Sequence, residues 1–358
     1  MRWGLVLRDP FARRLLCKLV FCLAAVAAVV LASPASTAQA GPLQLNKVRN
    51  WAYQLQNIDP LQIQDSPFDL VVVDYGFSKD SAATYPREVI DLMRTKPDGG
   101  RRFVFAYLSI GEAERYRYYW DDNWYAKLPE WIDTENTDWP GNFLVKFWHP
   151  EWQALIYGSP GAYLDRIVDA GFDGVYLDGI DKFEQWTSRR PSAAADMVTL
   201  IAELGAYARG KRSGFLVIPQ NGDKLIRDPR LLRAIDGISR EDLLYGESAL
   251  GERNAVTSIA EAVARLQIVQ AAGKPVLVVE YPRGIELSSS IMDEIQKFGF
   301  VGYVTNRELN HLTAPLVGTA DQSEGPWGSG GAPPVLYLAP GAGMQPAPHL
   351  PAGTTGHR

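Results

Sequence analysis

The chain has 358 residues, and 46% of them are hydrophobic, which is enough apolar material to bury a large core in one domain. Charged residues make up 22%, and the formal net charge is −5. A nucleic-acid-binding protein usually carries a basic face or stripe, so this mildly acidic balance argues against nucleic acid as a partner.

Residues 1–40 have the pattern of a targeting segment. Basic residues precede an uncharged apolar run over residues 19–32, and the small residues Ala38 and Ala40 suit cleavage by a signal peptidase. The run is short for a membrane span, but the long basic stretch before it keeps an uncleaved N-terminal anchor as an alternative. We therefore expect a secreted or extracellular protein, with periplasmic or membrane-anchored forms as alternatives. Membrane contact is expected only if this segment is retained.

The residues available for catalysis exclude several mechanisms. Both cysteines, Cys17 and Cys22, lie inside the targeting segment, so the mature chain has no thiol nucleophile and no cysteine metal site. The 4 histidines include no His-Glu-x-x-His pair, and no Gly-x-Ser-x-Gly elbow occurs. We expect neither a metal nor an organic cofactor.

A repeating pattern occupies the middle of the chain. Short runs rich in Val, Ile, Leu, Phe and Tyr alternate with helical stretches, the clearest of which are 87–94, 152–170, 193–209 and 259–272. Gly171, Gly210 and Gly273 stand where three of these helices should end. The predicted strands are 51–56, 68–75, 103–110, 174–178, 215–220, 234–239, 275–281 and 301–305.

Strands that alternate with helices pair in parallel, and eight such units match a closed (β/α)₈ TIM barrel in the α/β class. An open doubly wound sheet is the alternative, but no Gly-rich phosphate loop follows the first strand. We assign residues 41–312 to the barrel. From residue 313 to 358 the sequence is rich in Gly and Pro and has the composition of a disordered tail.

Polar and aromatic side chains follow seven consecutive predicted strands, where the active sites of such barrels lie. Any one acidic residue there could simply cap the next helix, but so many strand ends with tyrosines among them favour one shared mouth. The strand-end residues are Asp74, Tyr75, Tyr107, Ser109, Glu112, Asp178, Asp181, Gln220, Asn221, Glu241, Asp242, Glu280, Tyr281, Asn306, Arg307 and Glu308.

Such a mouth suits a sugar, because hydroxyl groups need acceptors and the apolar faces of sugar rings need aromatic planes. Breaking a glycosidic bond requires two carboxyl groups, one to protonate the leaving oxygen and one to attack or to activate water. The loop between the third and fourth strands adds further aromatics, some of which could form sugar subsites and most of which could simply pack over the rim. They are Tyr116, Tyr118, Tyr119, Trp120, Trp124, Trp131, Trp139 and Trp148.

Four motifs resemble those of glycoside hydrolase family 114, the endo-α-1,4-polygalactosaminidase-like family. They are Phe-Ala-Tyr-Leu-Ser-Ile-Gly-Glu-Ala-Glu at 105–114 with Arg117 and Trp120, Gly-Phe-Asp-Gly-Val-Tyr-Leu-Asp at 171–178, Ile-Pro-Gln-Asn-Gly at 218–222 and Val-Leu-Val-Val-Glu-Tyr at 276–281. The resemblance covers residues 50–310. It implies a (β/α)₈ barrel that cleaves α-1,4-linked galactosamine polymers of microbial exopolysaccharide.

The resemblance also implies a catalytic Asp after the fourth strand and a catalytic Glu after the sixth, here Asp178 and Glu241. Asp242 adjoins Glu241 and could take its place if the register differs by one residue. Glu280 is a second alternative, because barrel glycosidases often place their carboxylates on strands four and seven. Neighbouring residues of a strand face opposite sides, so only one of Glu280 and Tyr281 can face the mouth, and the resemblance favours Tyr281.

The sequence thus predicts a secreted endo-acting glycoside hydrolase that acts on a cationic amino-sugar polysaccharide, with Asp178 as nucleophile and Glu241 as general acid/base if the mechanism is retaining. A non-catalytic carbohydrate-binding barrel of the cell wall or matrix is the alternative. We expect the substrate to be held by Asp74, Tyr75, Tyr107, Ser109, Glu112, Asp181, Gln220, Asn221, Glu280 and Tyr281.

Overall fold

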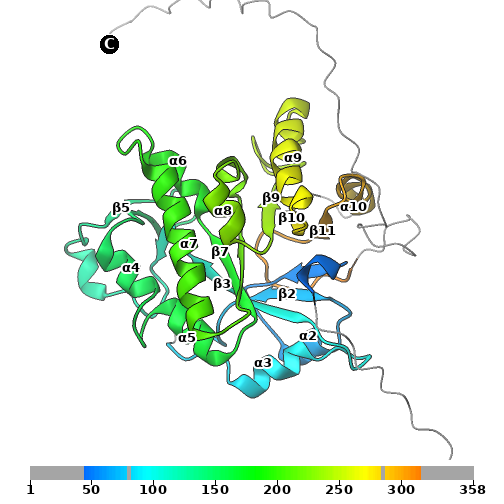
Figure 1. The fold of residues 1–358 in the computed structure, drawn as a ribbon, viewed down its shortest axis with the longest axis horizontal. Coiled ribbons are helices and arrows are strands. Elements are labelled where there is room, and N and C mark those ends of the chain that lie inside the picture. The colour runs from blue at the N-terminus through cyan, green and yellow to red at the C-terminus, as the bar shows by residue number, and fades with distance from the viewer. Residues whose placement is uncertain (1–43, 79–81, 284–286, 316–358) are drawn as a thin grey trace, which may run out of the picture. The chain divides into compact units, whose positions relative to one another are not determined.

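The computed structural model describes residues 44–78, 82–283 and 287–315. Eight parallel strands lie in the order in which they occur along the chain, and helices pack on their outer side (Figure 1). The strands are β1 (Trp51–Tyr53), β2 (Leu70–Val73), β3 (Phe103–Ser109), β7 (Gly174–Asp178), β8 (Leu216–Pro219), β9 (Ile238–Glu241), β10 (Val276–Glu280) and β11 (Val301–Val304).

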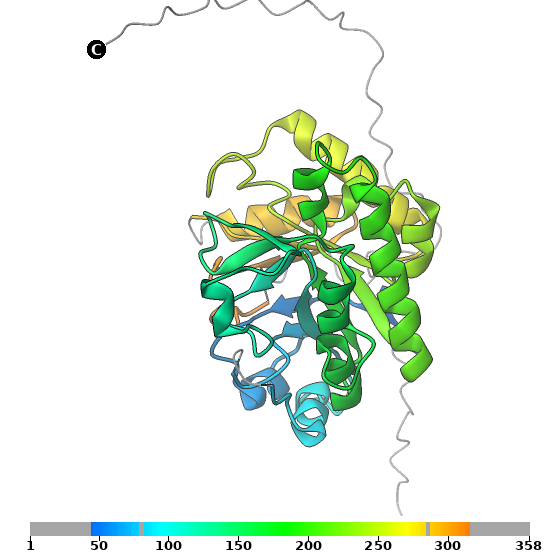
Figure 2. The ribbon, with the colours of Figure 1, turned by 90° about the vertical axis from the view of Figure 1, so that its left-hand side faces the viewer.

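Each connection between consecutive parallel strands contains at least one helix, as parallel pairing requires. The long helix α7 runs along the outside of the strands (Figure 2). The helices are α2 (Pro60–Gln64), α3 (Arg87–Arg94), α4 (Pro150–Ile156), α5 (Tyr163–Ala170), α6 (Phe183–Trp186), α7 (Ala193–Lys211), α8 (Pro229–Ala234), α9 (Val256–Ala271) and α10 (Ser288–Lys297).

The strand ladder has two seams. Between β8 and β9 a single parallel bridge, Gln220 to Ser239, joins the five-stranded block to the three-stranded block. Between β11 and β1 no ladder forms within the described residues; instead, the indole N–H of Trp51 donates to the Val301 carbonyl at 3.0 Å. The strand ladder is therefore open at this seam, where the Trp51 side chain bridges the two strands.

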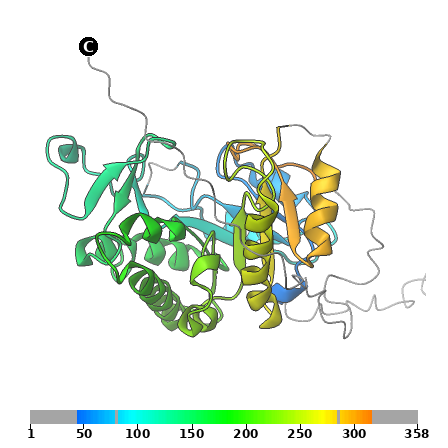
Figure 3. The ribbon, with the colours of Figure 1, turned by 90° about the horizontal axis from the view of Figure 1, so that it is seen from above.

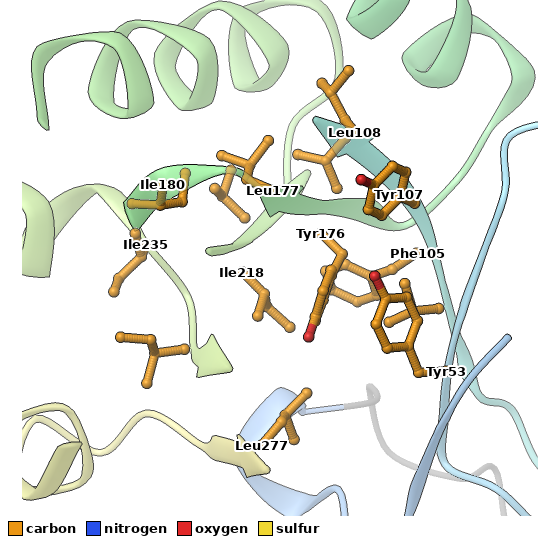
Figure 4. Packing of buried hydrophobic residues seen from close by; sticks show 14 of the residues in the cluster. Tyr53, Phe105, Tyr107, Leu108, Tyr176, Leu177, Ile180, Ile218, Ile235 and Leu277 are labelled. Atoms are coloured by element: carbon orange, nitrogen blue, oxygen red, sulfur yellow. The ribbon is translucent and has the colours of Figure 1, made fainter. Parts of the chain in front are cut away.

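Aromatic rings fill the interior between the strands. Trp51 and Tyr53 of β1 pack on Tyr176 of β7, with ring centroids 6.1 Å and 5.0 Å from the Tyr176 ring. Figure 4 shows Tyr53 beside Tyr176. The Tyr176 hydroxyl donates to Ser239 Oγ of β9 at 2.7 Å, which ties distant strands together across the interior. This packed core supports the carboxyl ends of the strands from below, as in other barrels of this kind.

Two predicted elements have different bounds in the structure. The strand expected over 234–239 begins four residues later, because α8 continues to Ala234 after its N-terminus is capped by Asp228. The helix expected over 152–170 is two helices, α4 and α5, because Gly158 takes a left-handed conformation (φ 97°) and Pro160 follows it.

The predicted helix ends are partly correct. Gly171 follows α5 in a left-handed conformation (φ 101°), and Gly273 does the same after α9 (φ 74°), as predicted. The prediction for Gly210 was wrong, because α7 continues through it to Lys211. An isolated glycine inside a helix is tolerated at a cost of about 1 kcal/mol relative to alanine.

The long connection between β3 and β7 forms a small antiparallel sheet on one side of the molecule, opposite α10 (Figure 3). Within this connection Trp131 packs on Trp124 and Trp152, with ring centroids 5.2 Å away in each case. Most aromatic side chains of the connection are therefore structural. Trp139, with 48% of its surface exposed, is an exception. The strands of this sheet are β4 (Glu112–Glu114), β5 (Ile132–Glu135) and β6 (Asn142–Val145).

The predicted targeting segment, residues 1–40, lies outside the described residues, and so does the predicted tail from residue 316 onward. Within the described ranges, no helix is both long enough and apolar enough to cross a bilayer.

Candidate active site

A cavity of about 280 Å³ opens where the carboxyl ends of the strands meet. All eight parallel strands contribute to its wall, either with a residue inside the strand or with one that follows it within five positions. The contributing side chains in strand order are Tyr53, Asp74, Tyr107, Asp178, Gln220, Glu241, Tyr281 and Arg307.

Asp178 is the last residue of β7 and lies in the wall of this cavity. The Tyr107 hydroxyl donates to its Oδ2 at 2.8 Å. Burial raises the pKa of the Asp178 carboxyl above its ordinary value, and the negative charges of Glu241 and Asp181 raise it further. Asp178 and Glu241 therefore lie close enough for the charge of Glu241 to raise the pKa of Asp178.

Glu241 ends β9 and is held by neutral donors on both carboxyl oxygens. The Asn221 amide donates to Oε1 at 2.8 Å, and the Tyr281 hydroxyl donates to Oε2 at 3.2 Å. In return, Asn221 Oδ1 accepts from the Glu241 backbone N–H at 3.1 Å. Burial raises the pKa of the Glu241 carboxyl, and the adjacent Asp242 adds to the effect.

Asn221 can make this reciprocal contact because its backbone is left-handed, with φ 58°. Asparagine tolerates this region better than most residues, although the conformation still costs free energy. A strained backbone beside a buried carboxyl is typical of a functional site.

Arg117 forms the centre of a second cluster beside Asp178. Its guanidinium donates to both oxygens of Asp74 at 2.8 and 2.9 Å and to Glu114 Oε2 at 2.6 Å. Burial alone would lower the pKa of Arg117, but the carboxylates of Glu114 and Asp74 raise it above its ordinary value. Tyr107 also reaches Glu114 Oε1 at 3.3 Å, so this cluster is linked to Asp178 through one hydroxyl.

Six of the ten predicted substrate-binding residues lie in the cavity wall together with both predicted catalytic residues. Asn221 is not in the wall; it contacts Glu241, as described above. The six residues that do line the cavity are Asp74, Tyr107, Glu112, Asp181, Gln220 and Tyr281.

Three other predicted substrate-binding residues also lie away from the cavity wall. Glu280 is fully buried, and its carboxyl oxygens accept from the backbone N–H groups of Leu244 at 2.8 Å and Tyr245 at 3.2 Å. Ser109 donates to the backbone oxygen of Glu112, and buried Tyr75 packs edge-to-face on the Tyr163 ring, 4.9 Å away. Strand alternation explains the Glu280 result, because it turns Tyr281 toward the cavity and Glu280 away from it.

Several lining residues were not among the predicted site residues. Glu114 and Arg117 belong to the first motif. Their opposite charges, three residues apart in the sequence, could have indicated the buried ion pair that they form. Lys182 pairs with Glu112 at 3.3 Å, and Arg307 pairs with Asp242. Among the other lining residues, Arg307 and Glu308 are predicted strand-end residues, and Tyr116 and Trp139 are predicted loop aromatics. The unpredicted lining residues with polar or aromatic side chains are Tyr53, Gln56, Glu114, Arg117, Asn142 and Lys182.

No group of three or more His, Cys, Asp or Glu side chains in the described part of the chain has the arrangement of a metal site. The polar groups of the cavity wall are carboxyl, hydroxyl, amide, guanidinium and ammonium groups.

The model of glycoside-hydrolase family GH114 matches residues 32–320 of the chain. An uncharacterized protein of Thermotoga maritima is 37% identical over 273 residues, which cover 73% of this chain and 81% of that protein. The uncharacterized protein MJ1477 of Methanocaldococcus jannaschii is 37% identical over 278 residues, which cover 73% of this chain and 77% of that protein.

Among solved structures, the glycoside hydrolase domain of PelA from Pseudomonas aeruginosa is similar with a TM-score of 0.58 and 19% identity. The similarity covers 75% of this chain and 98% of that chain. At this identity the likeness concerns the fold, and it confirms the predicted TIM barrel despite the seam between β11 and β1. The chain therefore belongs to glycoside-hydrolase family GH114 and is a glycoside hydrolase.

Proposed function

We propose that this glycoside hydrolase cleaves α-1,4-linked galactosamine-containing exopolysaccharide within the chain, with Asp178 and Glu241 as its two carboxyl groups. The observation that carries the proposal is that both carboxyls line one cavity and both have raised pKa values. The sugar and the linkage come from the motif resemblance, and the excess of carboxylates in the cavity supports a cationic polymer.

In the proposed reaction Glu241 protonates the glycosidic oxygen as the bond to the anomeric carbon breaks. Burial raises its pKa, and this is the direction of shift that a general acid requires. Asp178 attacks the anomeric carbon in a retaining mechanism, or activates a water molecule in an inverting one. The Tyr107 hydroxyl, 2.8 Å from Asp178, stabilises the carboxylate form that either role needs.

The test is release of reducing ends from a galactosamine polymer by wild type, Asp178→Asn and Glu241→Gln. We expect both variants to fold and to lose at least 100-fold in turnover, within the range attributed to acid–base catalysis, ~10²–10⁴-fold. Turnover like wild type in Asp178→Asn would remove that residue from the mechanism. Binding of the polymer without any release by wild type would instead indicate the carbohydrate-binding alternative.

The stereochemistry of the product separates the two mechanisms. Proton NMR of the first product formed shows whether the new reducing end has the α or the β configuration. A retained α-anomer would support Asp178 as nucleophile, and an inverted product would make it the base that activates water.

We further propose that the enzyme is exported by residues 1–40. The support is the sequence pattern of a basic start, an apolar run and the small residues Ala38 and Ala40. N-terminal sequencing of the protein recovered outside the cytoplasm should begin at Gly41. A start at Met1 in a membrane fraction would support the anchor instead.

A further inference from the structure

The Tyr107 hydroxyl lies between two carboxyl groups. It is 2.8 Å from Asp178 Oδ2 and 3.3 Å from Glu114 Oε1. A hydroxyl has one proton to donate, and O–H···O hydrogen bonds are commonest at about 2.7–2.8 Å. Burial raises the pKa of Tyr107 well above its ordinary value, so the hydroxyl keeps its proton. The proton is therefore directed to Asp178, and Glu114 is the competing acceptor.

Two other donors keep Glu114 from taking this proton. The Tyr116 hydroxyl donates to Glu114 Oε1 at 2.5 Å, and the Arg117 Nε donates to Oε2 at 2.6 Å. Glu114 is only 1% exposed, so water has little access to its carboxylate. A buried carboxylate that lost one of these donors would need another, and the Tyr107 hydroxyl lies 3.3 Å from the same Oε1.

The chain brings both tyrosine hydroxyls to this one oxygen from different elements. Tyr107 lies inside β3, whereas Tyr116 follows the end of β4 by two residues. The Arg117 guanidinium packs on both rings, with its central carbon 5.6 Å from the Tyr107 centroid and 5.2 Å from the Tyr116 centroid. The positions of the two hydroxyls on Glu114 are therefore fixed by one buried cation.

We propose that Tyr116 is a positioning residue of the reaction, because its hydroxyl occupies the Glu114 oxygen that otherwise competes with Asp178 for the Tyr107 proton. The proposal rests on the proposed role of Asp178. A proton donated by Tyr107 favours the carboxylate form of Asp178, which that role requires. Tyr116 thus acts on the reaction through Glu114 and Tyr107, although its ring also lines the cavity.

The test is the pH dependence of kcat/KM on the galactosamine polymer, whose acid limb reports an essential carboxylate of the free enzyme. The hydrogen bond from Tyr107 lowers the pKa of Asp178, so its loss in Tyr107→Phe should move the acid limb to higher pH. A hydrogen bond to a charged group corresponds to a shift of about one to two pH units.

Tyr116→Phe keeps the ring in the cavity wall and removes only the hydroxyl. We expect its acid limb to move in the same direction by about half as much, because the Tyr107 proton is then shared between Asp178 and Glu114. No shift would overturn the proposal. A fall in kcat/KM of equal size at every pH would also overturn it, and would indicate that the Tyr116 hydroxyl contacts the sugar instead.

The other titratable side chains that act on Asp178 are the same in all of these proteins. A shift between two variants therefore reports the Tyr107 hydroxyl rather than a change in the surrounding charges. These side chains are Glu241, Asp181, Lys182, Tyr53 and Tyr176.

Tyr119→Phe is the matched control, because it also removes a hydroxyl that contacts Glu114. The Tyr119 hydroxyl accepts from the backbone N–H of Glu114 at 3.0 Å, so its loss leaves the donors to the carboxylate in place. We expect the acid limb of Tyr119→Phe to coincide with that of wild type. An equal shift in Tyr116→Phe and Tyr119→Phe would overturn the proposal and indicate general loosening of the connection.

The double variant Tyr107→Phe/Tyr116→Phe shows whether Tyr116 acts through Tyr107. Without the Tyr107 hydroxyl there is no proton to redirect, so adding Tyr116→Phe should leave the acid limb of Tyr107→Phe unchanged. Two shifts that add in full would overturn the proposal, because Tyr116 would then act on Asp178 by another route.

A measurement without turnover separates failure of this proposal from failure of the proposed function. The Asp178 carboxyl is titrated by carboxyl-carbon NMR in aspartate-labelled protein, with Asp178→Asn used to assign its signal. Turnover like wild type in Asp178→Asn would remove the proposed role of Asp178. Even then, a higher Asp178 pKa in Tyr116→Phe than in wild type would support control of the Tyr107 hydroxyl by Tyr116. Equal pKa values would overturn it.

Discussion

Asp178 shows how function and stability oppose each other at a single residue. Its carboxyl is surrounded by protein and by the negative charges of Glu241 and Asp181, so its pKa is raised. A raised carboxyl pKa means that the folded state binds the proton more tightly than the unfolded chain does. Its contribution to stability is therefore complete below the unfolded pKa, near 4, and is lost as pH rises toward the folded value.

We therefore expect Asp178→Asn to be more stable than wild type at neutral pH. The gain should shrink as pH falls toward 4, because wild-type Asp178 then becomes protonated and neutral like asparagine. Each unit of pKa difference corresponds to about 1.4 kcal/mol. Thermal unfolding of both proteins between pH 4 and pH 7 checks this. A stability difference that does not depend on pH would contradict it.

Glu280 is a buried residue whose carboxyl group holds the neighbouring backbone rather than lining the cavity. Its two oxygens accept from the N–H groups of Leu244 and Tyr245, and burial raises its pKa to about 8. In Glu280→Gln an amide NH₂ would face one of these N–H donors. Above pH 8, where the wild-type carboxyl is ionised, we expect a loss of about 1–3 kcal/mol in unfolding free energy, as for a buried polar group without a partner.

Below its melting temperature, Glu280→Gln should turn over polymer within a few-fold of wild type, whereas Glu241→Gln should not. Parallel measurements of melting temperature and reducing-end release on the two variants check this. If Glu280→Gln were fully stable but inactive, the acid/base role would move to Glu280.

At the scale of elements, the ends of β3 and β7 meet through two glycines. A Cβ at Gly111 would lie 2.0 Å from the Gly179 carbonyl oxygen, so the backbones approach more closely than a side chain allows. Asp178 immediately precedes Gly179, and Asp181 follows it by two residues. Close packing of these strand ends therefore sets the position of two carboxyl groups in the cavity.

Gly111→Ala should displace this junction and lower turnover by about 100-fold, the cost of misplacing a reacting group by about 1 Å. Gly210→Ala is the control, because Gly210 lies in exposed helix with nothing within 4 Å of an added Cβ. That change should keep activity and stabilise the protein by about 0.5–1 kcal/mol. Full activity in Gly111→Ala, measured on the same polymer, would show that the junction tolerates movement.

At the scale of the whole molecule, the Trp51 side chain bridges the open seam between β11 and β1. Its indole N–H donates to Val301, and its ring packs on Tyr53 and Tyr176 under the cavity. Since no ladder joins these two strands in the described ranges, one side chain replaces a row of backbone hydrogen bonds.

Trp51→Phe should reduce the unfolding free energy by about 1–3 kcal/mol, because the buried Val301 carbonyl loses its donor. Trp139→Phe is the control, since Trp139 is 48% exposed at the cavity rim and should have little effect on stability. Urea unfolding midpoints of the two variants check this. Equal midpoints would mean that the Trp51 hydrogen bond does not stabilise the seam.

Much of the architecture could be read from local patterns. Alternating apolar runs and helical stretches predicted eight parallel strands. Seven of the eight strands lie within the predicted ranges, because the periods of strands and helices are local properties of the chain. The eighth, β9, begins later than expected because the N-cap at Asp228 and the packing of α8 decide where the helix ends. Such competition between neighbouring elements is a tertiary effect.

The sequence by itself determined the barrel and the ring of polar residues at its mouth, because position at the end of a parallel strand follows from chain order. Which of those residues face the cavity was decided by the tertiary structure. Glu280 turns away from the cavity to the Leu244 and Tyr245 backbone, whereas Asp181 lies in the cavity wall. Pairing between charges depends on distances between strands, and no local pattern encodes those distances.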